Sequence, residues 1–305
     1  MIKTKTLFIL GAGASVPFGY PASIGLREAI LRKGNDVTIL KALNYQDDDP
    51  KPFQREFNRF LNEFARSSVY SIDSFLEYRT EFMEIGKINI AAFLINHEDD
   101  GKLRFSGNNW YMYLYDRLKV SFDQFDQNNI SFITFNYDRS LEQFLYEAIR
   151  CRFGKSPQEC AEKLKSIPIV HLYGQLDPLP WQGENGRKYS SKENLIDRLR
   201  AASKNIKLIS DERDISKSED FHNAYNLIND AQRIFFLGFS FDETNLDRLN
   251  IGLMKNKLIV GTALGLETSK HNWVTHHFRD KIQTNIVLHQ DMDALSLLKT
   301  FLVIE

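Results

Sequence analysis

The sequence is poor in cysteine, carries almost no net charge and has no long apolar run. Its two cysteines, Cys151 and Cys160, are too few for an all-cysteine zinc site or a disulfide framework, and they suit a reducing cytoplasm. Lys and Arg number 39 and Asp and Glu number 40, so the net charge of -1 creates no field that draws in nucleic acid or an anionic membrane. No stretch approaches the ~20 apolar residues of a membrane span, and no targeting signal precedes Gly11. We therefore expect a cytoplasmic protein with no zinc, no membrane partner and no indicated nucleic-acid partner.

Two common nucleotide-binding motifs are also missing. The apolar run Thr6–Leu10 stops at the loop Gly11-Ala12-Gly13-Ala14-Ser15. This loop lacks the third glycine of the dinucleotide fingerprint, and no second strand ending in an acid follows ~20 residues later, which argues against an ordinary dehydrogenase. The GxxxxGK[ST] loop of NTPases is absent as well. Two interpretations of the glycine loop stay open: its backbone N–H groups meet a phosphate, or the turn packs tightly against another strand.

The patterning that is present predicts an α/β protein. With 305 residues, 43% of them hydrophobic, the chain can bury the core of one large domain, 1–305. Continuously apolar runs are typical of buried parallel strands, and they lie at Thr6–Leu10, Ile130–Phe135, Ile167–Leu172, Ile206–Ile209, Arg233–Leu237, Leu258–Val260 and Asn285–Leu288. Helical spacing occurs between them at Leu141–Ile149, Glu193–Ala202, Phe221–Asp230, Asn245–Met254 and Met292–Phe301. This alternation predicts a Rossmann-like, doubly wound, mostly parallel sheet.

The interval from about residue 36 to 125 contains no strand-like run and predicts an inserted helical layer. Large apolar residues follow helical spacing there, at Phe53, Phe57, Phe60, Leu61 and Phe64, and again at Phe75, Leu76, Phe82 and Met83 after a helix cap at Ser71 or Asp73. Burial in the core explains this stripe better than a pocket wall does. We interpret the charged segments 44–52 and 96–102 as solvated loops, and Asp47–Asp49 lacks the spacing of a calcium loop.

Polar residues follow three of the predicted strands. They are Thr134, Asn136 and Asp138 after one run, His171 after the next, and Gly238, Ser240 and Asp242 after Arg233–Leu237. Because the carboxyl ends of strands in an open α/β sheet face the ligand crevice, these positions suit polar chemistry, and an imidazole there can act as a base. Simpler roles stay open, since Asp138 and Asp242 can cap the following helices and a histidine at a strand end can be structural. Asn136 has no evident capping role.

Four short motifs in a fixed order suggest a family. GAGAS, TFNYD, VHLYG and LGFS resemble the NAD-binding motifs of the sirtuin superfamily, and they extend from Leu7 to about Asp247. The similarity is closer to the sirtuin-like domains of bacterial antiphage defence proteins than to protein deacetylases. The segment YSIDSFLE in the helical interval also looks like that group.

The resemblance implies a Rossmann-like sheet that binds NAD+ as a substrate across its crevice. By motif position, the phosphates and the adjoining ribose would contact Gly11, Ala12, Gly13, Ala14 and Ser15. Thr134, Asn136 and Asp138 would surround the nicotinamide ribose, His171 would be the catalytic histidine, and Gly238 and Ser240 would flank the adenosine. We expect Asn136, Asp138 and His171 to be catalytic. The implied activity is cleavage of NAD+ to nicotinamide and ADP-ribose, which would deplete the cofactor during phage infection.

The chain departs from deacetylating sirtuins in two respects. Those enzymes carry a four-cysteine zinc module, which Cys151 and Cys160 cannot build, and their first loop contains an acid and an arginine, whereas this chain has neither until Arg27. An NAD-dependent protein deacylase and a non-enzymatic module that binds NAD or ADP-ribose stay open as alternatives.

Uncontrolled NAD+ hydrolysis would kill the host cell, and the motifs occupy nearly the whole chain without leaving a sensor domain. We therefore expect gating by a homo-oligomer or by a partner protein. By family analogy that partner is a translocase-type (HerA-like) ATPase. The helical layer is the candidate contact surface or lid, although core packing explains its aromatic residues equally well.

Overall fold

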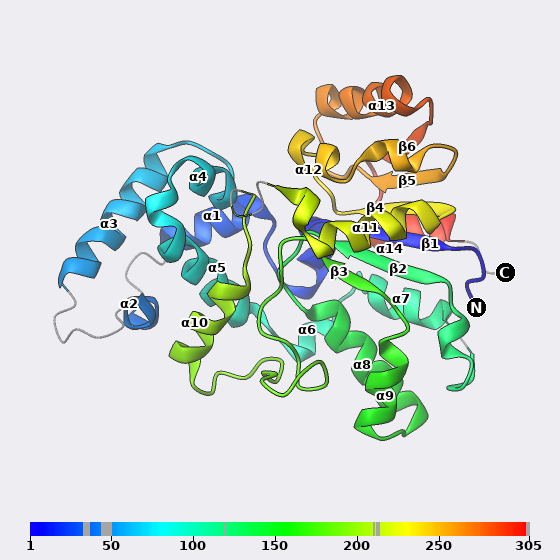
Figure 1. Cartoon of the computed structure of the whole chain (residues 1–305), viewed down its shortest axis with the longest axis horizontal. Helices are drawn as coiled ribbons and strands as arrows, with labels where there is room; N and C mark the ends of the chain where they lie inside the picture. The colour runs from blue at the N-terminus through cyan, green and yellow to red at the C-terminus, as the bar shows by residue number, and fades with distance from the viewer. Residues whose placement is uncertain (33–36, 44–50, 119, 210, 212–213, 303–305) are drawn as a thin grey trace.

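Six parallel strands form one sheet in the order β3–β2–β1–β4–β5–β6. They are β1 (Thr6–Leu10), β2 (Ile130–Thr134), β3 (Ile169–His171), β4 (Arg233–Leu237), β5 (Leu258–Thr262) and β6 (Ile286–His289). The computed structural model describes residues 1–32, 37–43, 51–118, 120–209, 211 and 214–302. The sheet with its flanking helices confirms the predicted Rossmann-like, doubly wound α/β fold (Figure 1).

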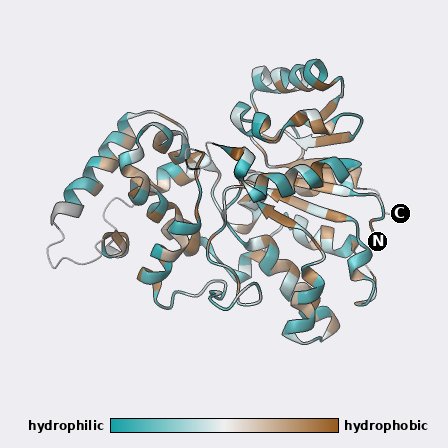
Figure 2. Ribbon diagram, viewed as in Figure 1, coloured by the Kyte–Doolittle hydropathy of each residue, from teal (hydrophilic) through white to brown (hydrophobic). Residues whose placement is uncertain are grey.

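Helices cover both faces of the sheet, which is why its central strands are continuously apolar. Phe8 and Leu10 of β1 pack into a core with helices on one face, namely α7 (Trp110–Arg117), α8 (Ser140–Phe153), α9 (Pro157–Leu164) and α14 (Ala294–Phe301). Leu7 and Ile9 pack into a second core with α11 (Glu219–Asp230) and α13 (Thr268–Ile282) on the other face. Figure 2 shows much of the strands in brown, whereas α13 at the edge of the molecule is largely teal.

The connection from β1 to β2 begins with a separate group of helices beside the carboxyl ends of the strands (Figure 1). This group comprises α1 (Ser23–Arg32), α2 (Val37–Leu43), α3 (Lys51–Arg66), α4 (Ile72–Tyr78), the short turn η2 (Thr80–Phe82) and α5 (Met83–His97). A helix from the connection between β3 and β4, α10 (Leu195–Asn205), packs against α5 and α2. The rest of the β1–β2 connection contains α6 (Asp100–Phe105), α7 and η3 (Phe125–Gln127), and α7 returns to the sheet.

The aromatic stripe of the helical layer is core, as predicted. Phe57, Phe60 and Phe64 are fully buried, and the ring of Phe60 lies 6.0 Å from that of Phe75 and 5.7 Å from that of Phe82. The side chain of Phe53 lies outside the described residues. Ser71 rather than Asp73 caps α4, since its hydroxyl accepts a hydrogen bond of 3.1 Å from the backbone N–H of Ser74.

Two predicted elements are wrong. Ile206–Ile209 is not a strand but irregular chain after α10, in which Ile206 and Leu208 are buried and Lys207 N–H donates to the carbonyl of Tyr173 at 2.9 Å. Composition alone cannot distinguish such a short buried segment from a strand. The predicted helix Asn245–Met254 is two pieces, α12 (Glu243–Arg248) and η5 (Ile251–Met254), because Asn250 adopts a left-handed conformation with φ of +49°.

One predicted solvated loop is also wrong. In the segment 96–102, α5 continues to His97, and Glu98 is buried between Arg139 and Arg187. Residues 44–50, which include Asp47–Asp49, lie outside the described residues, and the remainder of that predicted loop, Lys51 and Pro52, begins α3.

The strand order places a switch point between β1 and β4. The chain leaves β1 toward β2 on one side and leaves β4 toward β5 on the other, which is the position in the strand order where open α/β sheets bind ligands. In Figure 1 the strands run toward the helical layer, so this edge of the sheet faces α1, α4 and α5.

Candidate functional site

The glycine loop after β1 packs directly against the turn after β4. Gly11 N–H donates to the carbonyl of Leu237 at 3.0 Å, and Gly13 N–H donates to the carbonyl of Gly238 at 2.9 Å. A Cβ atom on Gly11 would lie 2.6 Å from the carbonyl oxygen of Gly238, and one on Gly13 would lie 2.8 Å from its Cα. Both residues must therefore be glycine for the two backbones to approach, which is the packing interpretation of the loop.

Part of the loop is open to a ligand and part is not. Ala12 and Gly13 are partly exposed, whereas Gly11, Ala14 and Ser15 are buried. The loop continues as the 3-10 helix η1 (Ala12–Phe18). The phosphate contacts predicted for the loop stay a prediction. Ala12 and Gly13 are the residues of the loop that a ligand can reach.

Ser15 connects two of the predicted site residues. Its hydroxyl donates to Oδ2 of Asp138 at 2.7 Å and accepts from Nδ2 of Asn136 at 3.0 Å. Nδ2 of Asn136 also donates to the carbonyl of Gly11 at 3.0 Å, and the Asn136 N–H donates to Oγ1 of Thr134 at 3.0 Å. The side chain of Asn136 is thereby held across the ends of β1 and β2, and its two amide protons are engaged.

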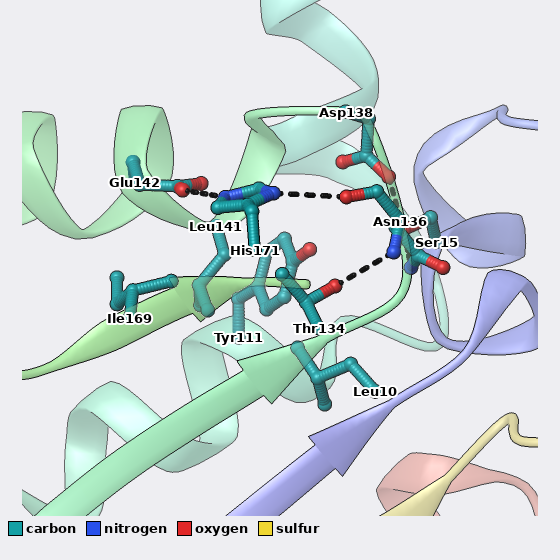
Figure 3. Close-up of a pocket in the computed structure, with 10 residues that line it drawn as sticks. All are labelled: Leu10, Ser15, Tyr111, Thr134, Asn136, Asp138, Leu141, Glu142, Ile169 and His171. Carbon is teal, nitrogen blue, oxygen red and sulfur yellow. Dashed lines mark hydrogen bonds and ion pairs between the residues drawn. The ribbon is translucent and has the colours of Figure 1, made fainter. Parts of the chain in front are cut away.

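His171 lies at the end of β3, where both of its ring nitrogens have partners (Figure 3). Nδ1 lies 2.9 Å from the carbonyl oxygen of Asn136, 35 positions away, and Nε2 lies 2.5 Å from Oε1 of Glu142. Burial alone would lower the pKa of His171, but the charge and hydrogen bond of Glu142 outweigh it, so the pKa is raised above its usual value.

Asp138 is buried in a dense set of hydrogen bonds. Oδ1 accepts from the backbone N–H of Ser140 at 3.1 Å and from the hydroxyl of Ser140, which in turn lies 2.8 Å from the hydroxyl of Tyr111. Burial raises the pKa of Asp138, against hydrogen bonds from Ser140 and Ser15 that lower it. Asp138 thus accepts an N–H bond from Ser140, the first residue of α8, as considered for it, although Arg139 and not Asp138 occupies the N-cap position. The bond to Ser15 adds a second role.

One small cavity connects these residues. Its lining, drawn in Figure 3, consists of Leu10, Ser15, Tyr111, Thr134, Asn136, Asp138, Leu141, Glu142, Ile169 and His171. The cavity measures about 10 Å³, the space that one water molecule needs. The predicted residues around the nicotinamide ribose therefore meet in one place, but the space between them is too small for a ribose.

Six predicted site residues do not line this cavity, namely Gly11, Ala12, Gly13 and Ala14 of the glycine loop and Gly238 and Ser240 after β4. Gly238 is partly exposed and contacts the glycine loop, and Ser240 is exposed on the turn after β4. Asp242 caps α12, since its carboxylate accepts from the N–H of Asn245 at 3.2 Å.

Sequence reasoning missed Glu142 and Tyr111. Glu142 belongs to the stripe that α8 turns toward the core, because it shares a helix face with Leu145, Tyr146 and Ile149, all of them buried. A buried carboxylate is rare unless it has a partner. The position of Glu142 among apolar residues at helical spacing was visible in the sequence and indicated such a buried, paired carboxylate.

Two features are absent from the described residues. No group of three or more His, Cys, Asp or Glu side chains there is arranged to hold a metal ion. No helix within the described ranges combines the length and the apolar character that crossing a membrane requires.

Comparison with known proteins assigns no function to the chain. No protein-family profile matches the chain, and no curated protein sequence matches it.

Proposed function

We propose that this chain hydrolyses NAD+ at the bond between nicotinamide and ribose, releasing nicotinamide and ADP-ribose. The observation that carries the proposal is the meeting of His171 and Asn136 in one cavity at the carboxyl ends of β2 and β3, beside the loop after β1. Ligands of open α/β sheets bind at this edge. The ordered resemblance of GAGAS, TFNYD, VHLYG and LGFS to sirtuin motifs supports NAD+ as the ligand.

The chemistry fits the side chains that are present. Nicotinamide is bound to ribose as a cationic pyridinium, so it leaves as a neutral molecule and needs no acid, unlike the leaving oxygen of an ordinary glycoside. A water oxygen forms the new bond to the anomeric carbon while the carbon–nitrogen bond breaks and its electron pair leaves with nicotinamide. Nε2 of His171 takes the proton of that water, a step that general-base catalysis accelerates by about 10²–10⁴-fold.

Asn136 and Asp138 have supporting roles in this proposal. The amide protons of Asn136 are engaged by Gly11 and Ser15, so its oxygen is the end that can accept a hydrogen bond from the ribose or the water. Asp138 orients Ser15 and thereby Asn136. The carboxylates of Asp138 and Glu142 also favour positive charge, which develops on the ribose as nicotinamide leaves.

The small size of the cavity supports a gated activity. A space of about 10 Å³ cannot admit a ribose, so the site must open before NAD+ reaches His171. We propose that assembly, either of several copies of this chain or with a translocase-type ATPase, drives this opening. In that role the chain is an effector that depletes NAD+ during phage infection in the cytoplasm.

The experiment follows by mass spectrometry the products that purified protein forms from NAD+. The protein is tested alone, at rising concentration, and together with a translocase-type ATPase where a neighbouring gene encodes one. Nicotinamide and ADP-ribose appearing together support hydrolysis. Acyl-ADP-ribose that forms only with an acylated peptide would instead identify a deacylase. NAD+ binding measured by calorimetry, with no product over hours in any condition, would identify a binding module and defeat the proposal.

A further inference from the structure

The two nitrogens of the His171 ring both face oxygen atoms. The carbonyl oxygen of Asn136 carries no proton, so Nδ1 at 2.9 Å must be the donor in that contact. Nε2 lies 2.5 Å from Oε1 of Glu142, and two lone pairs cannot meet at that distance, so a proton lies between them. In the conformation that the structure describes, Nε2 has no free lone pair with which to act as a base.

The surroundings favour the charged form of this ring. The titratable groups that line the cavity with His171 are Glu142 on α8, Asp138 on the loop between β2 and α8, and Tyr111 on α7. Burial raises the pKa of Tyr111 well above its usual value, so it is neutral and adds no charge near pH 7. Two carboxylates therefore face one imidazole, and the lining of this cavity includes no Lys or Arg.

Glu142 is buried together with His171. Its side chain is 3% exposed and that of His171 is 10% exposed, so the pair is shielded from water that would screen their attraction. Glu142 is in the first turn of α8, whose buried residues Leu145, Tyr146 and Ile149 anchor the helix in the core. The carboxylate is thus held beside the ring in the conformation that the structure describes.

We propose that Glu142 is a positioning residue that keeps a proton on Nε2 of His171 and holds the ring in a resting orientation until substrate replaces the Glu142 carboxylate beside Nε2. The consequence for catalysis rests on the NAD+ hydrolysis proposed above. A ribose hydroxyl or a water can meet the lone pair of Nε2 only after this proton has left for Glu142 or the solvent and the carboxylate has moved aside.

The variant Glu142→Gln distinguishes the effect of the Glu142 charge from the effect of its side-chain size. A glutamine keeps the size of the side chain, removes the negative charge, and can donate an amide proton to the lone pair of Nε2, so it stabilises the neutral ring. An adjacent opposite charge typically shifts a pKa by about 1–3 units. The pKa of His171 should therefore fall by about that amount in Glu142→Gln.

The test is a pH titration of the imidazole nitrogens by NMR on the full ¹⁵N-labelled chain, with His171→Ala to assign the signals. In the wild type the imidazole should titrate above the ordinary value of ~6.5, and in Glu142→Gln it should titrate at a lower pH than in the wild type. Glu147→Gln is the matched control, because Glu147 lies on the same helix and pairs with Arg150 at 3.2 Å instead. A wild-type ring that titrates at or below the ordinary value of ~6.5, or the same titration in both variants, would overturn the proposal.

Two further measurements keep the outcome clear. If Glu142→Gln fails to fold by circular dichroism, the wild-type titration still decides, and Glu142→Asp, whose carboxylate is shorter, should give an intermediate pKa. If NAD+ hydrolysis is observed, the acidic limb of its pH profile should move to lower pH in Glu142→Gln. A shifted titration without any nicotinamide release supports the role of Glu142 and contradicts the proposed hydrolysis. Nicotinamide release with an unshifted titration supports the hydrolysis and contradicts the role of Glu142.

Discussion

The hydroxyl of Ser15 donates a hydrogen bond of 2.7 Å to Oδ2 of Asp138, 123 positions away along the chain. This bond joins the loop after β1 to the loop after β2, at the edge of the sheet where both strands end. The same hydroxyl accepts from Nδ2 of Asn136. Ser15 is therefore a structural centre of the candidate site as well as a member of the glycine loop.

Ser15→Ala should destabilise the protein. It leaves the carboxylate of Asp138 buried with one donor fewer, and an unsatisfied buried group typically costs about 1–3 kcal/mol. Urea unfolding followed by circular dichroism measures the change. Ser240→Ala is the control, because Ser240 is exposed and substitutions of that kind stay within about 0.5 kcal/mol. Equal midpoints and slopes for the two variants would contradict the structural role of Ser15.

Gly238→Ala should disrupt the contact between the glycine loop and β4. Gly238 has φ of +58°, and a Cβ there would lie 2.0 Å from the backbone nitrogen of Ala14. Left-handed strain and the backbone clash together should cost at least about 3 kcal/mol. Gly265 offers a matched comparison, since its φ of +76° is similar but no atom lies within 4 Å of the added Cβ. Gly265→Ala should cost about 1–2 kcal/mol from strain alone, and a Gly238→Ala variant no less stable than that in thermal unfolding would contradict the close packing.

The sequence contained enough information for the sheet and for the convergence of its polar ends. Thr6–Leu10 and Arg233–Leu237 are strands with the predicted bounds, and their apolar runs reflect helices covering both faces of the sheet. Parallel strands end at one edge, so Asn136 and His171 were expected to meet, and both line one cavity, although the ring contacts the backbone carbonyl of Asn136 and not its carboxamide. The side-chain details were not predictable, because whether Asn136 turns its amide toward Gly11 depends on contacts across the fold.

The failures have a common cause. Ile206–Ile209 and Glu98 were judged from their neighbours in the sequence, whereas their environments come from distant segments. Arg139 reaches Glu98 over a sequence separation of 41 residues, and no local pattern reports such a pair. Glu142 differs, because its place in a buried helical stripe was visible in the sequence.

Glu98→Gln should strongly destabilise the protein. Glu98 is paired with Arg139 at 2.8 Å and with Arg187 at 2.6 Å, all three side chains being almost fully buried. Removing one partner of a buried ion pair typically costs about 3–5 kcal/mol, because the remaining charges stay buried without compensation. Glu28→Gln is the control, since its ion pair with Arg32 is exposed and should matter little.

The same pair predicts how stability depends on pH. Burial alone would raise the pKa of Glu98, but the hydrogen bonds and charges of Arg187 and Arg139 outweigh it and lower that pKa below its unfolded value. The stabilisation from Glu98 is therefore complete above the unfolded value of ~4.3 and is lost as the pH falls through the lower folded value. In urea titrations the difference in unfolding free energy between wild type and Glu98→Gln should be constant near neutral pH and shrink below about pH 4. A difference that grows with acidity would contradict this assignment.

Turnover should depend on His171 and Asn136 in different ways. His171→Ala removes the proposed base and should lower kcat for NAD+ hydrolysis by about 10²–10⁴-fold. Asn136→Ala removes a hydrogen-bonding group from the ribose or the water, for which a loss of about 10–100-fold is expected. Because the alanine in the His171 variant cannot titrate, its residual rate should also lose the acidic limb of the pH profile.

The controls for turnover are His276→Ala and Asn272→Ala, which remove the same side chains from exposed positions on α13. Both should keep the wild-type rate of nicotinamide release. Circular dichroism must show that all four variants are folded, since Asn136 also holds the loop after β1 through Gly11. A folded His171→Ala protein that hydrolyses NAD+ at the wild-type rate would show that the imidazole is structural, because no other histidine lines this cavity to replace it as a base.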